Sequence, residues 1–162
     1  MKTLILGLGN DMLSDDAVGL VAARRLRNIV GEHIDIMECN EAGIALLDVL
    51  VGYDRVIILD AFHSGDYPSG TVFEMAFDEL RPIPGMSPHY AGLPEVLSIG
   101  KNLGLSIPDV IQIFAVEIPE YLTIGGTLSK PVAYAVDELT NGAMHRLQEW
   151  EEAAGDNQGF GG

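Results

Sequence analysis

The sequence is poor in basic residues. Lys and Arg together number nine, against 24 Asp and Glu, and the formal net charge is −15. Nucleic-acid binding needs clustered Lys and Arg, so this composition argues against nucleic acid as a partner. The excess of acid favours solubility, and the alternative interpretation is a partner that is cationic or carries a metal.

Cysteine and long apolar runs are scarce as well. The one cysteine, Cys39, excludes an internal disulfide and is typical of a reducing compartment. The opening segment MKTLILGLGN holds one Lys and a short apolar run, which is too short for a signal peptide or a membrane span. We therefore expect a cytoplasmic protein without a membrane partner.

The 162 residues, 48% of them hydrophobic, are enough for one domain with a core of its own. Strand-like and helix-like patterns alternate along the chain, which predicts an α/β fold with a largely parallel sheet covered on both faces. Strands are expected at 3–9, 33–38, 55–62, 70–77 and 109–118, and helices at 17–30, 42–50, 93–104 and 129–152. We expect one domain over residues 1–152 and a disordered tail over 153–162, where periodicity is lost.

The first loop, GLGNDMLSDDAVG at residues 7–19, begins like a phosphate-binding turn but does not continue as one. Met12 stands where the third glycine of G-x-G-x-x-G belongs, and no Lys or Arg lies between Lys2 and Arg24. Two aspartates, Asp15 and Asp16, precede the expected helix and would repel a pyrophosphate. This excludes the usual dinucleotide site.

Polar side chains at the carboxyl ends of parallel strands are the natural candidates for a site. One of Asp15 and Asp16 can cap the following helix, which leaves the other to be explained. Asp60 follows the apolar run RVIIL, where a buried carboxylate needs a partner. His89 lies in a loop, and on its own it could be a residue that only stabilises that loop. Together, one loop aspartate, Asp60 and His89 form a possible O,O,N metal site with open coordination positions.

These residues belong to a wider pattern. The first loop resembles the signature G-x-G-N-x-x-x-x-D-[DE]-x-x-G of the hydrogenase maturation endopeptidases. The resemblance continues through EAGIALLD (41–48), IILDAF (57–62), PSGTV (68–72), SPHYAGLPEVL (87–97) and VEIPE (116–120). It thus spans almost the whole chain, and the combination of these motifs is far more specific than any one of them.

The resemblance implies a single three-layer α/β/α sandwich with a mostly parallel twisted sheet. It implies a peptidase of the aspartate/metal type that acts, as a monomer, on the large-subunit precursor of a NiFe hydrogenase. The enzyme would remove the C-terminal extension once nickel is in place, and the precursor would supply the nickel. The matching metal-contacting and catalytic positions are Asp16, Asp60 and His89, which makes Asp15 a helix cap or a support to the site. Ala17 and Glu41 stand where many relatives carry Gly and Thr.

Other readings find less support in the sequence. It contains no G-x-S-x-G or H-E-x-x-H motif, and Glu38 beside Cys39 disfavours a thiolate nucleophile. His63 is either a support to the site or a solvated loop residue, whereas His33 and His145 are expected at the surface. A peptidyl-tRNA hydrolase shares the G-L-G-N loop but would need a basic cleft. A nickel-loading checkpoint or chaperone that binds the precursor without cutting it stays open, because no nucleophile is evident.

Overall fold

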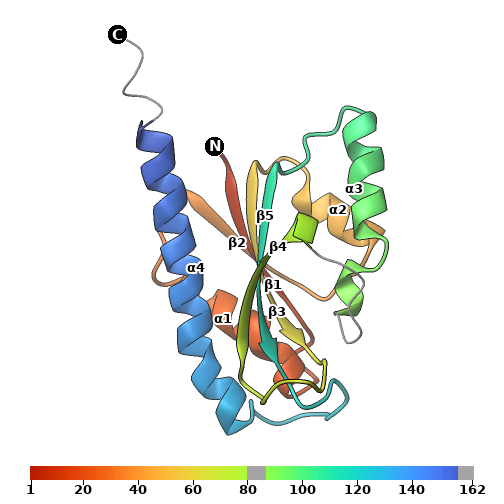
Figure 1. Cartoon of the computed structure of the whole chain (residues 1–162), viewed down its shortest axis with the longest axis vertical. Coiled ribbons are helices and arrows are strands. Elements are labelled where there is room, and N and C mark those ends of the chain that lie inside the picture. Colours follow the sequence, from red (N-terminus) through yellow and green to blue (C-terminus); the bar gives the residue numbers. More distant parts are fainter. Residues whose placement is uncertain (80–86, 157–162) are drawn as a thin grey trace.

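The structure is a computed structural model that describes residues 1–79 and 87–156. Figure 1 shows one sheet between two layers of helices. The strands are β1 (Thr3–Leu8), β2 (Ile34–Cys39), β3 (Arg55–Phe62), β4 (Val72–Ala76) and β5 (Val110–Glu117). The α-helices are α1 (Val18–Leu26), α2 (Ile44–Leu50), α3 (Leu93–Asn102) and α4 (Lys130–Asp156). Short 3-10 turns lie at η1 (Asp15–Ala17), η2 (Phe77–Glu79) and η3 (Pro88–Tyr90).

The five-stranded sheet has the order β2-β1-β3-β5-β4. All neighbouring strands run parallel except the edge strand β4, which is antiparallel to β5. The order reverses between β1 and β3, because the chain leaves β1 toward β2 and then returns to the other side of β1. This confirms the predicted α/β class and the mostly parallel sheet.

Each face of the sheet has its own apolar core. On one face, Ile5, Ile57 and Phe114 pack against α1 and α4. On the other, Leu6, Ile58 and Ile113 pack against α2 and α3. Successive side chains of the central strands therefore belong alternately to the two cores, as expected for parallel strands covered on both sides. The result is the predicted α/β/α sandwich (Figure 1).

Two glycines of the first motif allow β1 and α1 to pack closely. A Cβ on Gly7 would lie 2.6 Å from the carbonyl oxygen of Gly19, and a Cβ on Gly19 would lie 2.3 Å from that of Leu59. Real Cβ atoms are not found at such distances, so both positions need glycine. The motif thus sets the position of α1, and with it the start of the first loop, against the sheet.

Several boundaries differ from the predictions. The helix expected at 17–30 ends at Leu26, and most other elements begin or end one or two residues away from the predicted bounds. Residues 153–156, expected in a disordered tail, continue α4, which ends at Asp156; residues 157–162 of that tail lie outside the described part of the chain. The strand at 55–62 has the predicted bounds, so β3 continues past Asp60 to Phe62. The ladder between β3 and β5 runs on to the pair Phe62–Glu117, and these backbone hydrogen bonds outweigh the polarity of one side chain.

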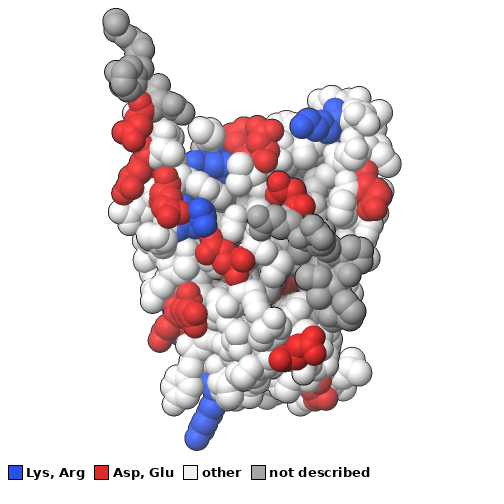
Figure 2. All heavy atoms as spheres, viewed as in Figure 1, with Lys and Arg blue, Asp and Glu red and all other residues white. Residues whose placement is uncertain are grey.

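Acidic side chains are spread over the face seen in Figure 2, where Lys and Arg are few. This distribution agrees with the low count of basic residues and shows no basic surface for nucleic acid on that face. Within residues 1–79 and 87–156, no helix is long and apolar enough to cross a membrane.

Candidate functional site

The candidate site lies at the reversal of strand order, where the carboxyl ends of β1 and β3 meet. The ladder between these strands ends at the pair Gly7–Leu59, whereas β3 continues beside β5. Asp60 is therefore the first residue of β3 beyond β1, and it faces the region into which the first loop turns. In open α/β sheets such a crevice is where ligands bind.

Asp60 is a buried carboxylate with a hydrogen bond to only one of its two oxygens. Its side chain is 1% exposed. Its Oδ1 accepts a hydrogen bond from the backbone N–H of Ala61 at 2.8 Å. Its Oδ2 is buried and makes no hydrogen bond of good geometry within the described chain, although the Ser87 and Tyr90 hydroxyls are near enough to interact with the carboxylate. Burial raises the pKa of Asp60 to about 6, although the charge of His89 and the nearby hydroxyls of Ser87 and Tyr90 act in the opposite direction.

Asp16 approaches from the first loop. It is buried in η1, and its Oδ2 accepts a hydrogen bond from the backbone N–H of Asn10 at 3.0 Å. Burial raises the pKa of the Asp16 carboxyl, and the charge of His89 partly offsets this. Gly9 makes the turn possible, because its φ is +151° and a Cβ there would lie 2.2 Å from the Asp16 carbonyl oxygen.

His89 completes the group from η3. Its ring is buried, and Nδ1 lies 2.6 Å from the carbonyl oxygen of Glu41. Since a carbonyl can only accept, Nδ1 donates in this contact, and Nε2 is the ring nitrogen left to bind a ligand. A backbone carbonyl behind one ring nitrogen is the usual support of a metal-binding histidine, because it orients the ring and selects the tautomer.

The three predicted residues are thus near enough for the charge of His89 to lower the pKa of both carboxyls. They do not form a ready cage: among residues 1–79 and 87–156, no group of three His, Cys, Asp or Glu side chains is placed to hold a metal ion by itself. The orphaned Oδ2 of Asp60, the carboxylate of Asp16 and Nε2 of His89 are nevertheless the donor types that suit a borderline divalent cation such as nickel.

Asp15, adjacent to Asp16, has a different role. Its Oδ1 accepts from the backbone N–H of Ser129 at 2.7 Å, and its Oδ2 accepts from the Ser129 hydroxyl at 2.8 Å. Ser129 immediately precedes α4, so Asp15 ties the first loop to the start of that helix rather than capping its own. Further bonds join the same segments, from Ser14 N–H to the Thr123 carbonyl and from Gly125 N–H to the Met12 carbonyl.

We expect Asp15→Asn to destabilise the fold. The substitution replaces two charge-assisted hydrogen bonds by weaker neutral ones, so the free energy of unfolding should fall by about 1–2 kcal/mol. Urea unfolding at pH 8, compared with the unmodified chain, measures this. An unchanged or higher free energy of unfolding would contradict a purely structural role for Asp15.

Two tyrosines near the site were not predicted from the sequence. The charges of Asp60 and Asp16 help burial to raise the pKa of Tyr121 to about 12. Burial also raises the pKa of Tyr90 well above its usual value, and the Asp60 carboxylate, with which its hydroxyl interacts, adds to this. Tyr90 follows His89 directly, which is the one sequence signal that could have drawn attention to it.

The other candidates take supporting or surface positions. His63 is half-buried, with Nδ1 2.9 Å from the Ile118 carbonyl oxygen and its backbone N–H donating to the Tyr121 hydroxyl. Glu41 is exposed, and its carbonyl is what holds His89. Burial raises the pKa of the Cys39 thiol, which agrees with the prediction that it is no nucleophile. His33 and His145 are exposed, as predicted.

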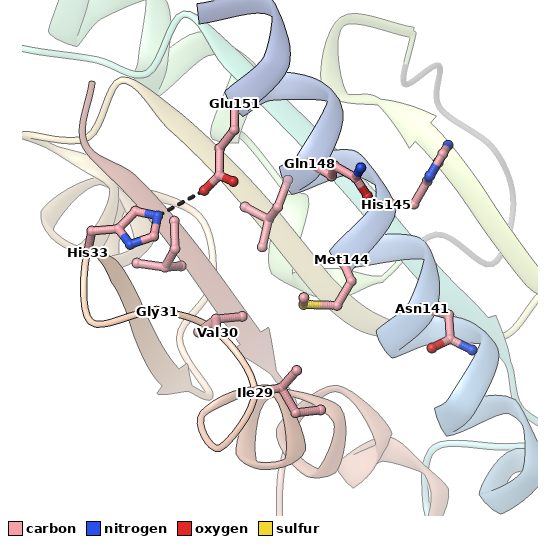
Figure 3. A pocket seen from close by; sticks show the side chains of 11 residues that line it. Ile29, Val30, Gly31, His33, Asn141, Met144, His145, Gln148 and Glu151 are labelled. Carbon is pink, nitrogen blue, oxygen red and sulfur yellow. Dashed lines mark hydrogen bonds and ion pairs between the residues drawn. The ribbon is translucent and has the colours of Figure 1, made fainter. Parts of the chain in front are cut away.

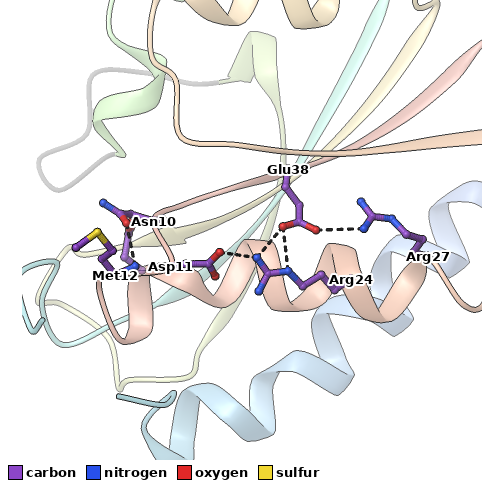
Figure 4. A network of polar contacts seen from close by, with 7 residues as sticks. Asn10, Asp11, Met12, Arg24, Arg27 and Glu38 are labelled. Carbon is purple, nitrogen blue, oxygen red and sulfur yellow. Dashed lines mark hydrogen bonds and ion pairs between the residues drawn. The ribbon is translucent and has the colours of Figure 1, made fainter. Parts of the chain in front are cut away.

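An ion-pair network braces the outer side of the first loop. Arg24 of α1 lies 2.6 Å from Asp11 and 2.7 Å from Glu38 of β2, and Arg27 contacts the same glutamate at 3.4 Å (Figure 4). In the same view the Asn10 side chain accepts from the backbone N–H of Met12. The pairs are largely exposed, so each contributes little to stability. Their effect is to restrain the loop that carries Asn10 and Asp16.

A larger hollow of about 510 Å³ lies elsewhere, between α4 and the turn before β2 (Figure 3). Its polar side chains include the exposed pair His33–Glu151, 2.8 Å apart. This hollow is at the amino ends of the strands, and its ionisable groups face solvent. Size alone therefore does not make it the functional site, whereas the buried carboxylates Asp16 and Asp60 lie at the strand reversal.

Known proteins resemble the chain over nearly all of its length. A family model described as hydrogenase maturation protease matches residues 20–146. The hydrogenase 2 maturation protease of Escherichia coli (strain K12) is 32% identical over 153 residues, covering 92% of each chain. The hydrogenase expression/formation protein HupD of Rhizobium leguminosarum bv. viciae is 27% identical over 154 residues, covering 92% of this chain and 75% of that protein.

Solved structures give the same result. The hydrogenase maturating endopeptidase HybD from E. coli superposes with a TM-score of 0.76 at 28% identity, over 92% of this chain and 93% of that one. The NiFe hydrogenase maturation protease HybD from Thermococcus kodakarensis shares the fold, with a TM-score of 0.69 at 24% identity over 90% of this chain and 98% of that one. The chain therefore belongs to the hydrogenase maturation protease family, and its activity is that of a maturation protease.

Proposed function

We propose that the chain is a nickel-dependent endopeptidase that removes the C-terminal extension of a NiFe hydrogenase large-subunit precursor after nickel insertion. The observation that carries this proposal is the orphaned, buried Oδ2 of Asp60 beside Asp16 and His89. A buried carboxylate oxygen without a hydrogen bond of good geometry is costly, and a cation brought by the substrate would satisfy it.

Nickel is here part of the substrate. Asp16, Asp60 and Nε2 of His89 would complete its coordination from the open side of the precursor's metal site. Because the described residues include no three-ligand group placed to hold a metal ion, this proposal requires the precursor to supply ligands of its own. Cleavage is thereby conditional on metal loading.

Peptide hydrolysis requires water to attack the scissile carbonyl carbon, while the C–N bond breaks and the leaving amine gains a proton. A carboxylate that binds the cation stays ionised, so Asp60 would act as a ligand, and the proton of the attacking water would go to the leaving amine. Nickel could polarise the carbonyl or the water. We place this activity in the cytoplasm and in a monomer, and the free thiol of Cys39 is in keeping with a reducing compartment.

The test compares nickel-loaded and nickel-free large-subunit precursors incubated with the protein, with the mass of each precursor as the readout. We expect loss of a C-terminal peptide from the loaded form alone, and no loss with Asp16→Ala, Asp60→Ala or His89→Ala. Cleavage of both forms would contradict the nickel requirement. Binding of the loaded form without any cleavage would instead identify a loading checkpoint, and full activity of all three variants would overturn the site.

A further inference from the structure

A second pocket, of about 210 Å³, lies beside the site on the α2–α3 face of the sheet. Two cross-strand pairs, Phe73–Ala115 and Met75–Ile113, join β4 to β5 and contribute side chains to its wall. Phe62, Tyr67 and Tyr90 also line it. We call it the β4–β5 pocket.

The pocket adjoins the candidate site. Ala61, whose N–H binds the Asp60 carboxylate, contributes to its wall, as does Tyr90, which follows His89. Whatever occupies the pocket is therefore next to the residues proposed to meet the scissile bond. Its volume is below the usual 300–1,000 Å³ of pockets for drug-sized ligands, so it suits one side chain better than a cofactor.

The lining is apolar and aromatic. The rings of Phe62 and Phe73 pack edge to face with centroids 5.5 Å apart, and those of Tyr67 and Phe73 with centroids 4.8 Å apart. Tyr67 is 53% exposed, which leaves a large ring at the border between the pocket and solvent. Ser64 and Asp66 supply polar groups. An apolar wall with a few polar groups is typical of a binding pocket for a hydrophobic side chain.

Tyr90 joins the pocket to the candidate site. Its side chain is 4% exposed and lines the pocket, while its hydroxyl interacts with the Asp60 carboxylate. A side chain in the pocket would therefore pack against a ring that also contacts the site.

We propose that the β4–β5 pocket is a subsite for one large apolar residue of the precursor's C-terminal extension, next to the cleaved bond. The side chain fills the pocket and packs against the aromatic side chains of Phe73 and Tyr90. This inference rests on the proposed function, because it takes the precursor peptide as the occupant. It assigns the Phe73–Ala115 and Met75–Ile113 pairs to substrate selection. This role is separate from the proposed binding of nickel by the site residues.

The first test needs no cleavage. N-acetyl-leucinamide is titrated into protein labelled with ¹³C at the methionine methyl groups, and the Met75 signal, assigned with Met75→Leu, is followed. We expect a saturable shift of Met75 while Met37 and Met144 stay unchanged, and binding of N-acetyl-alaninamide weaker by about tenfold. An unmoved Met75 signal, or equal binding of both probes, would overturn the subsite.

The second test uses the nickel-loaded precursor. Ala115→Leu fills the pocket and should raise KM by about tenfold or more, with little change in kcat. Ala153→Leu, on the exposed side of α4, is the size-matched control. Alanine substitutions are also made, one at a time, at the large apolar residues of the extension. With one of these precursors, the KM of Ala115→Leu should equal that of the unmodified protein. Phe73→Ala, which enlarges the pocket, gives a second variant should Ala115→Leu fold poorly, and it should favour larger side chains.

The two proposals fail in different ways. Unmodified protein that cleaves the loaded precursor, with an unchanged KM for folded Ala115→Leu and for Phe73→Ala, overturns the subsite alone. Unmodified protein that cleaves no precursor overturns the proposed function, and the amide titration still decides whether the pocket binds a leucine side chain.

Discussion

Asp60→Asn should make the protein more stable at pH 8 while it abolishes precursor processing. Burial raises the pKa of Asp60 to about 6, compared with about 3.9 for an aspartate in an unfolded chain. At pH 8 the folded protein must therefore hold a charge that its surroundings disfavour. Asparagine has nearly the same shape, can still accept from the Ala61 N–H, and carries no charge.

The sign follows from proton linkage. Between about pH 4 and pH 6 the folded state binds more protons at Asp60 than the unfolded state does, so stability falls as the pH rises through this window. A difference of about two pKa units corresponds to about 3 kcal/mol, lost by pH 7–8. Asp60→Asn lacks this loss, and its melting temperature at pH 8 should rise by about 5–10 °C, with a smaller gain at pH 4.

Processing should fall by about a hundredfold or more in the same variant, because the amide does not bind a cation as a carboxylate does. Calorimetry at pH 4 and pH 8, together with the mass assay, measures both effects. The matched control is Asp15→Asn, also buried but fully hydrogen-bonded to Ser129, for which a loss of stability is expected. If Asp60→Asn were destabilised at both pH values, the carboxylate would be structural.

Gly9→Ala should cause a large loss of stability and disturb the site. At a φ of +151° alanine is strained, and its Cβ would lie 2.2 Å from the backbone carbonyl oxygen of Asp16. Strain and overlap together should lower the free energy of unfolding by about 3–5 kcal/mol. Because η1 must move to relieve the overlap, the folded fraction should also process the precursor at least about tenfold more slowly.

Gly104→Ala separates the two causes. Gly104 also has a positive φ, of +79°, but no described heavy atom beyond its chain neighbours lies within 4 Å of a Cβ built there. The free energy of unfolding of Gly104→Ala should therefore fall by only about 1 kcal/mol, because of backbone strain, and the variant should keep full activity. Equal losses in the two variants, measured by urea unfolding, would show that contact with Asp16 is not what requires Gly9.

The sequence alone determined the α/β class, the succession of strands and helices, and the short set of polar residues at strand ends. These follow from local rules: apolar periodicity marks each element, and parallel strands place their carboxyl ends at one edge of the sheet. Asp60 and His89 came from those rules. The choice of Asp16 over Asp15 came from the family resemblance, and the separate contacts of the two residues agree with it.

Only the tertiary structure decided what each of these groups contacts. Ser129, which binds Asp15, is 114 residues away along the chain, and the Glu41 carbonyl that orients His89 is 48 residues away. No periodicity encodes such pairs, because they depend on which strands become neighbours and on which loops cross their ends. The same holds for the β4–β5 pocket, whose walls exist only after β4 pairs with β5. Residue types thus predicted the chemistry, whereas burial and strand order set the charge state of Asp60 and what lies beside it.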